Sequence, residues 1–337
     1  MQKLIKEDYL EVQWLRLLAV LLLVTWHCFF CVIFVWGVVE PNAELYPLRR
    51  LSQFLMPDAV MPLFTFVSGY LFYALYYDRN KYRVFVSFCK SKIKRLLIPF
   101  VVFSVLIVLS TPNLHFEPII WGHGSHMWYC AMLFWCFIIA WTLLRINSRF
   151  LTILTIAFSI VLVLAYPNFH YMPIDLPLGI DNGLYYFSYF ALGGAIFNYK
   201  QIIFHKFHCK VLIVAGVYAG LWLLYISGIR YISRLAFSFQ CYLFVILLWL
   251  IVMILINKSL IRQSKRLTLL CECSFGIYVF HHWIAWNIVW YPPVSFFLQR
   301  DYNYVWLPLI MTPMIFGISY FTTKFLLKTR IGNYLLS

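Results

Sequence analysis

Two ionisable side chains near the N-terminus have a spacing that would let them act together. Arg16 and His27 are eleven residues apart in a stretch that is otherwise almost entirely apolar. Eleven residues make about three turns of α-helix, so both side chains would lie on one helix face, about 16 Å apart along the axis. Ionisable residues inside an apolar segment are costly, which makes both of them functional candidates. A buried neutral imidazole is also a proton acceptor near physiological pH.

Each of these residues has a structural interpretation as well. The Arg16 side chain could extend to the membrane interface, and His27 could bond to a neighbouring helix. For Arg16 taken alone, the structural interpretation is the more common one. For His27, its position deep in the apolar segment favours a chemical role.

The elements that must hold these residues follow from the composition. Of the 337 residues, 63% are hydrophobic and only 12% are charged, and the mean hydropathy is +0.81. These values exclude a soluble globular protein, in which about a quarter of residues are charged. The apolar runs are long enough to cross a hydrocarbon core of about 30 Å as helices, and the alternating pattern of a β-barrel is absent. We therefore expect an all-α fold, a polytopic membrane helical bundle.

The apolar runs predict about ten transmembrane helices. Their centres lie near Val24, Phe66, Leu106, Phe137, Phe158, Phe190, Trp222, Leu247, Phe280 and Phe316. No linker or soluble segment interrupts them, so residues 1–337 are expected to form a single transmembrane domain.

Basic residues predict the orientation of the chain. Every second connection is basic, and together these connections hold 21 of the 27 lysines and arginines. The basic positions are Lys3 and Lys6; Arg79 through Arg95; Arg145 and Arg149; Lys200, Lys206 and Lys210; Lys258 to Arg266; and Lys324 to Arg330. By the positive-inside rule both termini are cytoplasmic. The net charge of +15 is therefore mainly a matter of membrane orientation, and no nucleic-acid partner is expected.

The nine cysteines predict neither disulfides nor a metal site. Most lie within apolar runs, where cysteine acts as a small hydrophobic residue. Cys28 and Cys31 form a C-x-x-C pattern and Cys271 and Cys273 a C-x-C pattern, but a zinc site would require both pairs to meet.

Four further patterns follow Arg16 and His27 in order along the chain. The apolar run Met61 to Tyr70 ends in Ser-Gly-Tyr, and the basic run Lys92 to Pro99 ends in proline. His126 to Tyr129 reads His-Met-Trp-Tyr, and Ser274 to His281 reads Ser-x-x-x-Tyr-x-x-His. Together with Arg-x10-His in the first span, these patterns resemble the membrane acyltransferases of the acyltransferase 3 type, over the whole chain.

This resemblance implies an acyl-CoA-dependent O-acyltransferase of the cell envelope, in the bacterial inner membrane. It would transfer an acyl group, most often acetyl and otherwise succinyl, from cytoplasmic acyl-CoA to a sugar hydroxyl of a surface or lipid-linked glycan. His27 would be the catalytic general base, or a transient acyl carrier. Arg16 would be the second catalytic residue and would help to bind the acyl-CoA. Acyl-CoA is a substrate here, and no permanently bound cofactor is implied. Other envelope-glycan enzymes are possible partners.

The resemblance also implies two groups of binding residues. Those expected to bind acyl-CoA are Arg16, Lys92, Lys94, Arg95 and Ser68. Those expected to bind the acceptor or support the site are Tyr70, His126, Trp128, Tyr129, Ser274, Tyr278 and His281. His282 is expected to be structural.

Two positions depart from the family pattern, and two other functions remain open. Gln13 stands where many members carry an acidic or amide residue before the arginine, and it can still hydrogen-bond, while Leu17 stands in place of the glycine common after it. The alternatives are a transporter or flippase for a polysaccharide or lipid-linked intermediate, and a structural assembly partner. The paired broken helices of many transporters are absent from the sequence pattern. An assembly partner would leave Arg16 and His27 without a task.

Overall fold

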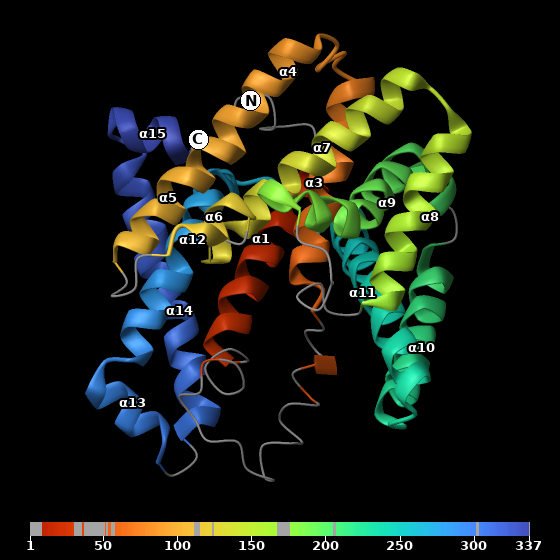
Figure 1. Cartoon of the computed structure of the whole chain (residues 1–337). Coiled ribbons are helices and arrows are strands. Elements are labelled where there is room, and N and C mark those ends of the chain that lie inside the picture. Colours follow the sequence, from red (N-terminus) through yellow and green to blue (C-terminus); the bar gives the residue numbers. More distant parts are fainter. Residues whose placement is uncertain are drawn as a thin grey trace. The chain divides into compact units, whose positions relative to one another are not determined.

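The fold is known from a computed structural model that describes residues 9–29, 36, 51, 53–54, 58–110, 115–122, 125–166, 176–204, 207–300 and 303–336. Lys3, Lys6, Cys31 and Lys206 lie outside the described residues. The described part is built from helices and contains no strand (Figure 1). The all-α prediction is therefore confirmed for this part of the chain.

Most of the described residues form helices and short helical turns, and a π-helical turn at residues 27–29 directly follows the first helix. The α-helices are α1 (Leu10–Trp26), α3 (Val60–Tyr77), α4 (Phe85–Lys92), α5 (Ile98–Leu109), α6 (Glu117–Ile120), α7 (Trp128–Ile146), α8 (Arg149–Ala165), α9 (Ile180–Phe204), α10 (Phe207–Ile226), α11 (Arg230–Asn257), α12 (Lys265–Val289), α13 (Pro292–Leu298), α14 (Asn303–Leu326) and α15 (Arg330–Leu336). The short turns are η3 (Ile93–Leu97), η4 (Ser125–Met127) and η6 (Pro177–Gly179).

Each of the ten predicted span centres lies in a helix, namely α1, α3, α5, α7, α8, α9, α10, α11, α12 or α14. Five helical segments of the described residues are long and apolar enough to cross a membrane. These are Leu10–Phe29, Val60–Tyr77, Trp128–Ile146, Tyr231–Asn257 and Pro308–Leu326. Two shorter apolar helices are Arg149–Ala165 and Lys210–Ile226. The protein is thus a helical membrane protein, while the count of ten crossings and the cytoplasmic termini stay predictions.

The chain folds into two compact units. The terminal unit comprises Met1–Val60 and Ile261–Ser337, and the central unit comprises Met61–Leu260. Each predicted site residue belongs to one of these units, so the two are described separately. The prediction of a single transmembrane domain stays a prediction.

In the terminal unit, α1 packs against α12 and α14 (Figure 1). The Gln263 side chain donates to Gln13 Oε1 at 3.2 Å, and the Cys271 thiol donates to the Gln13 carbonyl oxygen at 3.3 Å. Further along both helices, His27 meets His281 of α12. Because contacts late in α1 are made by residues late in α12, the two helices run in the same direction. Gln13 therefore contributes to the register of this pair, with both its side chain and its backbone.

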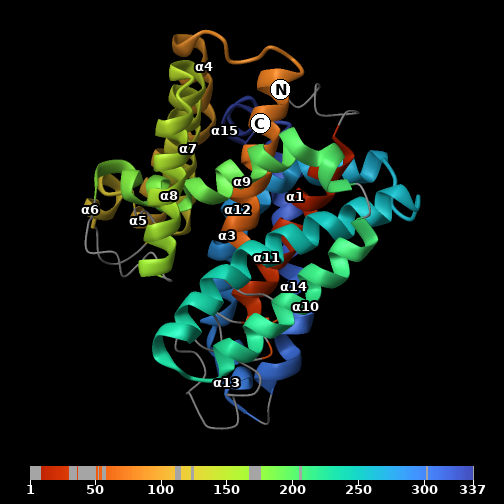
Figure 2. The ribbon, with the colours of Figure 1, turned by 90° about the vertical axis from the view of Figure 1, so that its right-hand side faces the viewer.

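In the central unit, α3 and α9 approach each other through glycines. A Cβ atom on Gly69 would overlap the backbone carbonyl group of Phe190, and one on Gly193 would overlap the backbone of Phe66. Small residues let helix backbones approach closely, which is a common basis of helix packing in membranes. Gly69 and Gly193 therefore allow the close packing of α3 and α9. Elsewhere in this unit α10 and α11 form an antiparallel pair, seen side by side in Figures 1 and 2.

A widened turn joins α4 to α5. Residues Ile93–Leu97 form a π-helical turn, a geometry that is rare and often found at functional sites. Pro99 then occupies the second position of α5, where the absence of a backbone N–H costs nothing. The basic run from Lys92 therefore leads directly into the first turn of α5.

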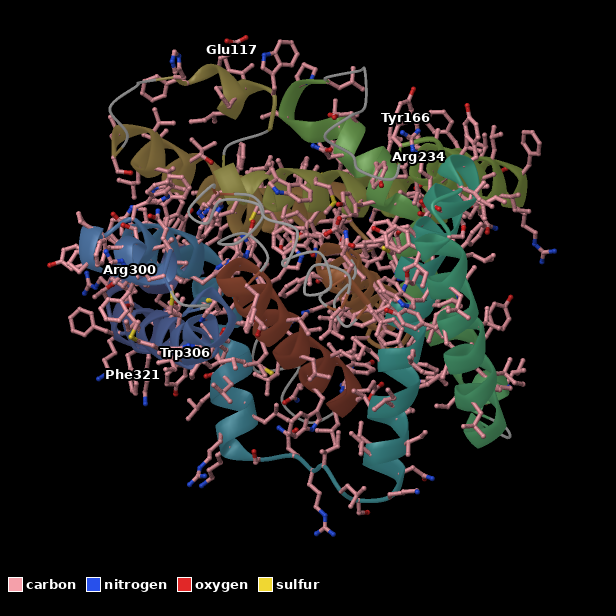
Figure 3. All side chains as sticks on the ribbon, turned by 90° about the horizontal axis from the view of Figure 1, so that it is seen from below. Glu117, Tyr166, Arg234, Arg300, Trp306 and Phe321 are labelled. Atoms are coloured by element: carbon pink, nitrogen blue, oxygen red, sulfur yellow. The ribbon has the colours of Figure 1, made fainter. Side chains whose placement is uncertain are left out.

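Large apolar side chains cover part of the surface, as expected where lipid is the solvent. Trp306 and Phe321 of α14 are 47% and 66% exposed, and Figure 3 shows both directed outward from the helix.

The Arg300 guanidinium lies over the Phe296 ring, 3.9 Å from its centroid, so its charge is stabilised by an aromatic face.

Candidate functional site

The centre of the candidate site is a pair of buried histidines from α1 and α12. His27 begins a π-helical turn (residues 27–29) directly after the last residue of α1, and His281 lies in the second half of α12. The Nε2 atom of His281 is 3.3 Å from the Nδ1 atom of His27. Their ring centroids are 4.7 Å apart, with an interplanar angle of 77°. His27 is 9% exposed and His281 is fully buried.

Backbone carbonyl oxygens hold both rings. His27 Nδ1 lies 3.0 Å from the carbonyl oxygen of Leu23, one turn earlier in α1. His281 Nδ1 lies 3.0 Å from the carbonyl oxygen of Ile277 and 2.7 Å from that of Tyr278. Both imidazoles are therefore fixed by their own helices as well as by each other. A general base needs such a fixed orientation to meet its proton donor.

Three more rings surround His27. The His282 ring centroid is 5.2 Å away, that of Trp26 is 5.3 Å away and that of Trp36 is 6.0 Å away. Trp36 also lies 5.3 Å from His282 and 5.3 Å from Trp286. These rings cover much of the histidine pair and limit its contact with water. Sequence reasoning overlooked Trp36 and Trp286 and gave His282 a structural role, and no spacing in the sequence links these residues to His27.

Other predicted residues of the terminal unit lie along the same two helices. Arg16 is half-buried on α1, and its charged side chain lies close enough to Cys271 of α12 for an electrostatic interaction with the thiol. Ser274 donates from its hydroxyl to the Cys271 carbonyl oxygen at 2.8 Å, a bond within α12. Tyr278 contacts His281 through its backbone carbonyl group, and the centroids of their rings are 6.2 Å apart. Arg16 and His27 belong to one continuous helical segment, Leu10–Phe29.

In the central unit, two predicted residues meet between α3 and α7. The Tyr129 hydroxyl faces the side chains of Ser68 and Thr65. Thr65, which sequence reasoning overlooked, is fully buried and donates to the Met61 carbonyl oxygen at 2.8 Å. Ser68 is half-buried and Tyr129 is buried, so the three hydroxyls form a polar group inside an apolar unit.

The remaining aromatic and histidine positions of this unit are more dispersed. Tyr70 is buried at the α3–α9 crossing, and its ring centroid is 5.5 Å from that of Phe197. Trp128 begins α7, 5.5 Å from the ring of Tyr186 in α9. His126 is half-buried in the preceding turn η4. Trp128 is thus near Tyr129, while Tyr70 takes part in helix packing.

A buried lysine lies at the end of α4. Lys92 is only 4% exposed, and its Nζ atom lies 3.3 Å from the centroid of the Phe137 ring and 4.9 Å from that of Tyr82. The Phe88 ring completes the enclosure at 5.8 Å. Aromatic faces attract cations, which partly offsets the loss of water around the ammonium group. Lys94, two residues later, is exposed instead.

Like charges gather around Lys92. Burial, with the neighbouring charges of Arg95 and Lys81 adding to it, holds the pKa of Lys92 well below its usual value of 10.5. Burial and Arg95 also lower the pKa of Lys81. Burial raises the pKa of Tyr82 to about 12, with Arg95 opposing the rise. Burial and mutual repulsion disfavour the charged state of these cations. An anion bound among them would offset both effects, so the group is suited to bind one.

Seven cysteines whose side chains the structure describes are free thiols. These are Cys28, Cys89, Cys130, Cys136, Cys241, Cys271 and Cys273. Within the described ranges, no three histidine, cysteine or acidic side chains are grouped so that they could hold a metal ion. Since Cys31 lies outside those ranges, the expectation of no metal site stays a prediction.

Comparison with known proteins connects this geometry to a family. A family model described as an acyltransferase domain matches residues 9–324, nearly the whole chain and all the site residues described above. Comparison with curated proteins and with solved structures gave no match.

Proposed function

The chain belongs to the acyltransferase 3 family, and from this premise we propose that it transfers an acyl group from cytoplasmic acyl-CoA to a sugar hydroxyl of a surface or lipid-linked glycan. Acetyl is the favoured group, and the bacterial inner membrane is the favoured location. The observation that carries the proposal is the buried and doubly held His27, a base shielded from water in a chain of this family.

The reaction needs one proton acceptor that later returns its proton. In the proposed mechanism His27 takes the proton from the acceptor hydroxyl while the hydroxyl oxygen attacks the thioester carbonyl carbon. A carbon–oxygen bond forms, the carbon–sulfur bond breaks, and the CoA thiolate takes the proton from the His27 imidazolium. The base is then regenerated, and the products are the acylated sugar and CoA. Enclosure by Trp36 and His282 favours acyl transfer to the sugar over hydrolysis by water.

The donor carries phosphate groups, for which the chain offers cations. Lys92 and Arg95, with Lys81 beside them, are proposed to bind these phosphates. An anion would offset the mutual repulsion and burial that lower the pKa of Lys92. Exposed Lys94 would guide the anion from solvent. Arg16, about three helical turns before His27, would pair with a phosphate of the donor.

Acceptor binding is proposed for polar and aromatic side chains. The hydroxyls of Tyr129 and Ser68 are suited to hydrogen-bond a sugar or the pantetheine arm of the donor, and Trp128 offers a flat face for a sugar ring. Tyr70, His126, Ser274 and Tyr278 are proposed as supporting residues. Among them, Ser274 and Tyr70 have local packing or bonding that already accounts for their burial.

The test is acceptor-dependent release of CoA from acetyl-CoA by the purified protein in lipid nanodiscs. Release that requires a glycolipid extract, with incorporation of labelled acetyl into a glycolipid, is the expected result. The transporter alternative predicts movement of a lipid-linked glycan across sealed proteoliposomes that is insensitive to acyl-CoA. Such movement, together with no binding and no release of CoA for any acyl donor, would overturn the proposal.

A further inference from the structure

We propose that His281 is a positioning residue that holds His27 in one tautomer, with the proton on Nδ1 and the lone pair on Nε2. Nε2 of His27 is then the atom that accepts the proton of the acceptor hydroxyl. The catalytic use of this lone pair rests on the proposed function, whereas the tautomer itself follows from the contacts of the two rings.

The argument begins at His281. Its Nδ1 atom lies 3.0 Å and 2.7 Å from two backbone carbonyl oxygens, those of Ile277 and Tyr278. Carbonyl oxygens only accept hydrogen bonds, so Nδ1 must carry a proton and donate it. His281 is fully buried in a helix of a membrane protein, which favours the neutral ring with a single N–H. Its Nε2 atom is therefore a hydrogen-bond acceptor.

The same reasoning then fixes His27. Its Nδ1 atom lies 3.0 Å from the Leu23 carbonyl oxygen and 3.3 Å from Nε2 of His281. Both neighbours accept, so the His27 atom between them must be the donor, shared between the two. The other tautomer would direct a lone pair at two further lone pairs. In the neutral ring the remaining nitrogen, Nε2, is left without a proton and acts as the base.

His281 also has a role once the proton has moved. When Nε2 of His27 takes the hydroxyl proton, the ring becomes an imidazolium, and its Nδ1–H bonds to His281 and Leu23 become charge-assisted. The lone pair of His281 thus stabilises the charge that develops in the reaction. Leu23 would still accept a bond if His281 were replaced, so the loss should be partial, about tenfold to a hundredfold in kcat, as for other supporting residues.

The first arm of the test needs no activity. Nitrogen-15 NMR of histidine-labelled protein in nanodiscs, with the His27 signals assigned by their loss in His27→Ala, distinguishes a protonated from an unprotonated ring nitrogen. We expect a protonated Nδ1 and an unprotonated Nε2 for His27 in the wild type. The opposite protonation would overturn the inference, whatever the protein is found to catalyse.

The second arm separates positioning from general structure. His281→Leu removes the acceptor, whereas the side-chain carbonyl of His281→Gln can replace it. We expect kcat to fall in the leucine variant with the KM for acyl-CoA unchanged, the His27 signals to become a mixture of tautomers, and glutamine to restore part of both. Trp283→Leu, at a 49% exposed position of the same helix, is the matched control and should change neither kcat nor the His27 tautomer. A folded leucine variant with wild-type kcat and an unaltered His27 tautomer would contradict the role of His281.

Discussion

Nε2 of His281 lies 3.3 Å from Nδ1 of His27, although 254 residues separate the two histidines in the chain. The contact depends on α1 and α12 running side by side in the same direction, with Gln13 bonded to Cys271 nearer the start of α1. The candidate base is therefore held by the packing of the first and a late helix of the terminal unit. Changes at the proposed binding residues of the central unit should alter substrate affinity without removing the proposed base.

Replacement of Lys92 should weaken donor binding without unfolding the protein. Methionine has a similar length and removes a buried charge from an aromatic enclosure, so Lys92→Met should fold at least as stably as the wild type. A hydrogen bond to a charged group contributes about 1.5–3 kcal/mol, so the affinity for acetyl-CoA should fall about tenfold to a hundredfold. Titration calorimetry in nanodiscs measures this. Lys90→Met, at an exposed position of the same helix, is the control, and an equal loss there would point to surface charge alone.

The lowered pKa of Lys92 predicts a dependence of stability on pH. In the unfolded chain this lysine titrates near 10.5, whereas in the folded protein it titrates well below that value. Between these two values the unfolded state binds more protons, so stability should rise with pH across that window. The destabilisation caused by burying the charged ammonium group is fully present below the pKa of Lys92 in the folded protein, and it is lost above 10.5. Thermal unfolding of wild type and Lys92→Met over this range should give curves that converge as pH rises, and a constant difference would refute the assignment.

The α3–α9 crossing should tolerate no side chain at Gly69. A Cβ atom there would overlap the Phe190 backbone, and overpacking costs about 1–3 kcal/mol. Gly69→Ala should therefore lower the melting temperature. Gly216→Ala is the matched control, because a Cβ atom on this α10 residue meets nothing within 4 Å and alanine favours helix by about 1 kcal/mol. Equal melting temperatures for the two variants would mean that the helices are not packed this closely.

Loss of Arg16 should affect the donor more than the acceptor. Arg16→Gln removes a charge that the proposed function pairs with acyl-CoA, so the KM for acetyl-CoA should rise about tenfold or more while the KM for the acceptor stays close to that of the wild type. Arg145→Gln removes the same charge from an exposed position of α7 and should change neither. Steady-state kinetics with each substrate varied in turn provides the measurement. A rise confined to the acceptor KM would assign Arg16 to the other substrate.

The helices could be predicted from the sequence because run length alone decides them. An apolar run long enough to cross a membrane must satisfy its own backbone, and helix is the simplest way to do so. Every predicted span centre accordingly lies in a helix. Arg16 lies in α1, which is continuous from Leu10 to Trp26, and His27 follows directly in a π-helical turn. The common face that helix period predicts for the two side chains stays a prediction.

The contacts of the site could not be predicted in this way. Whether His281 reaches His27 depends on how α1 and α12 pack, and no local pattern encodes that over 254 residues. Lys92 and Lys94 were both expected to bind acyl-CoA, but the sequence did not indicate that Lys92 is buried, that a π-helical turn follows it and that Lys94 is exposed. Tyr278 was expected to bind the acceptor or to support the site, but the sequence did not indicate that its backbone carbonyl group would contact the His281 ring.

The measurement that tests the account most directly is single-turnover acyl transfer by His27→Ala beside the wild type, both in nanodiscs with acetyl-CoA and glycolipid acceptor. Circular dichroism and acetyl-CoA affinity should match in the two proteins, because His27 is not proposed to bind the donor. We predict that the alanine variant forms acylated glycolipid at a rate about a hundredfold to ten-thousandfold below that of the wild type, because this is the usual contribution of a general base. A folded His27→Ala protein that transfers acetyl at the wild-type rate would contradict the central claim.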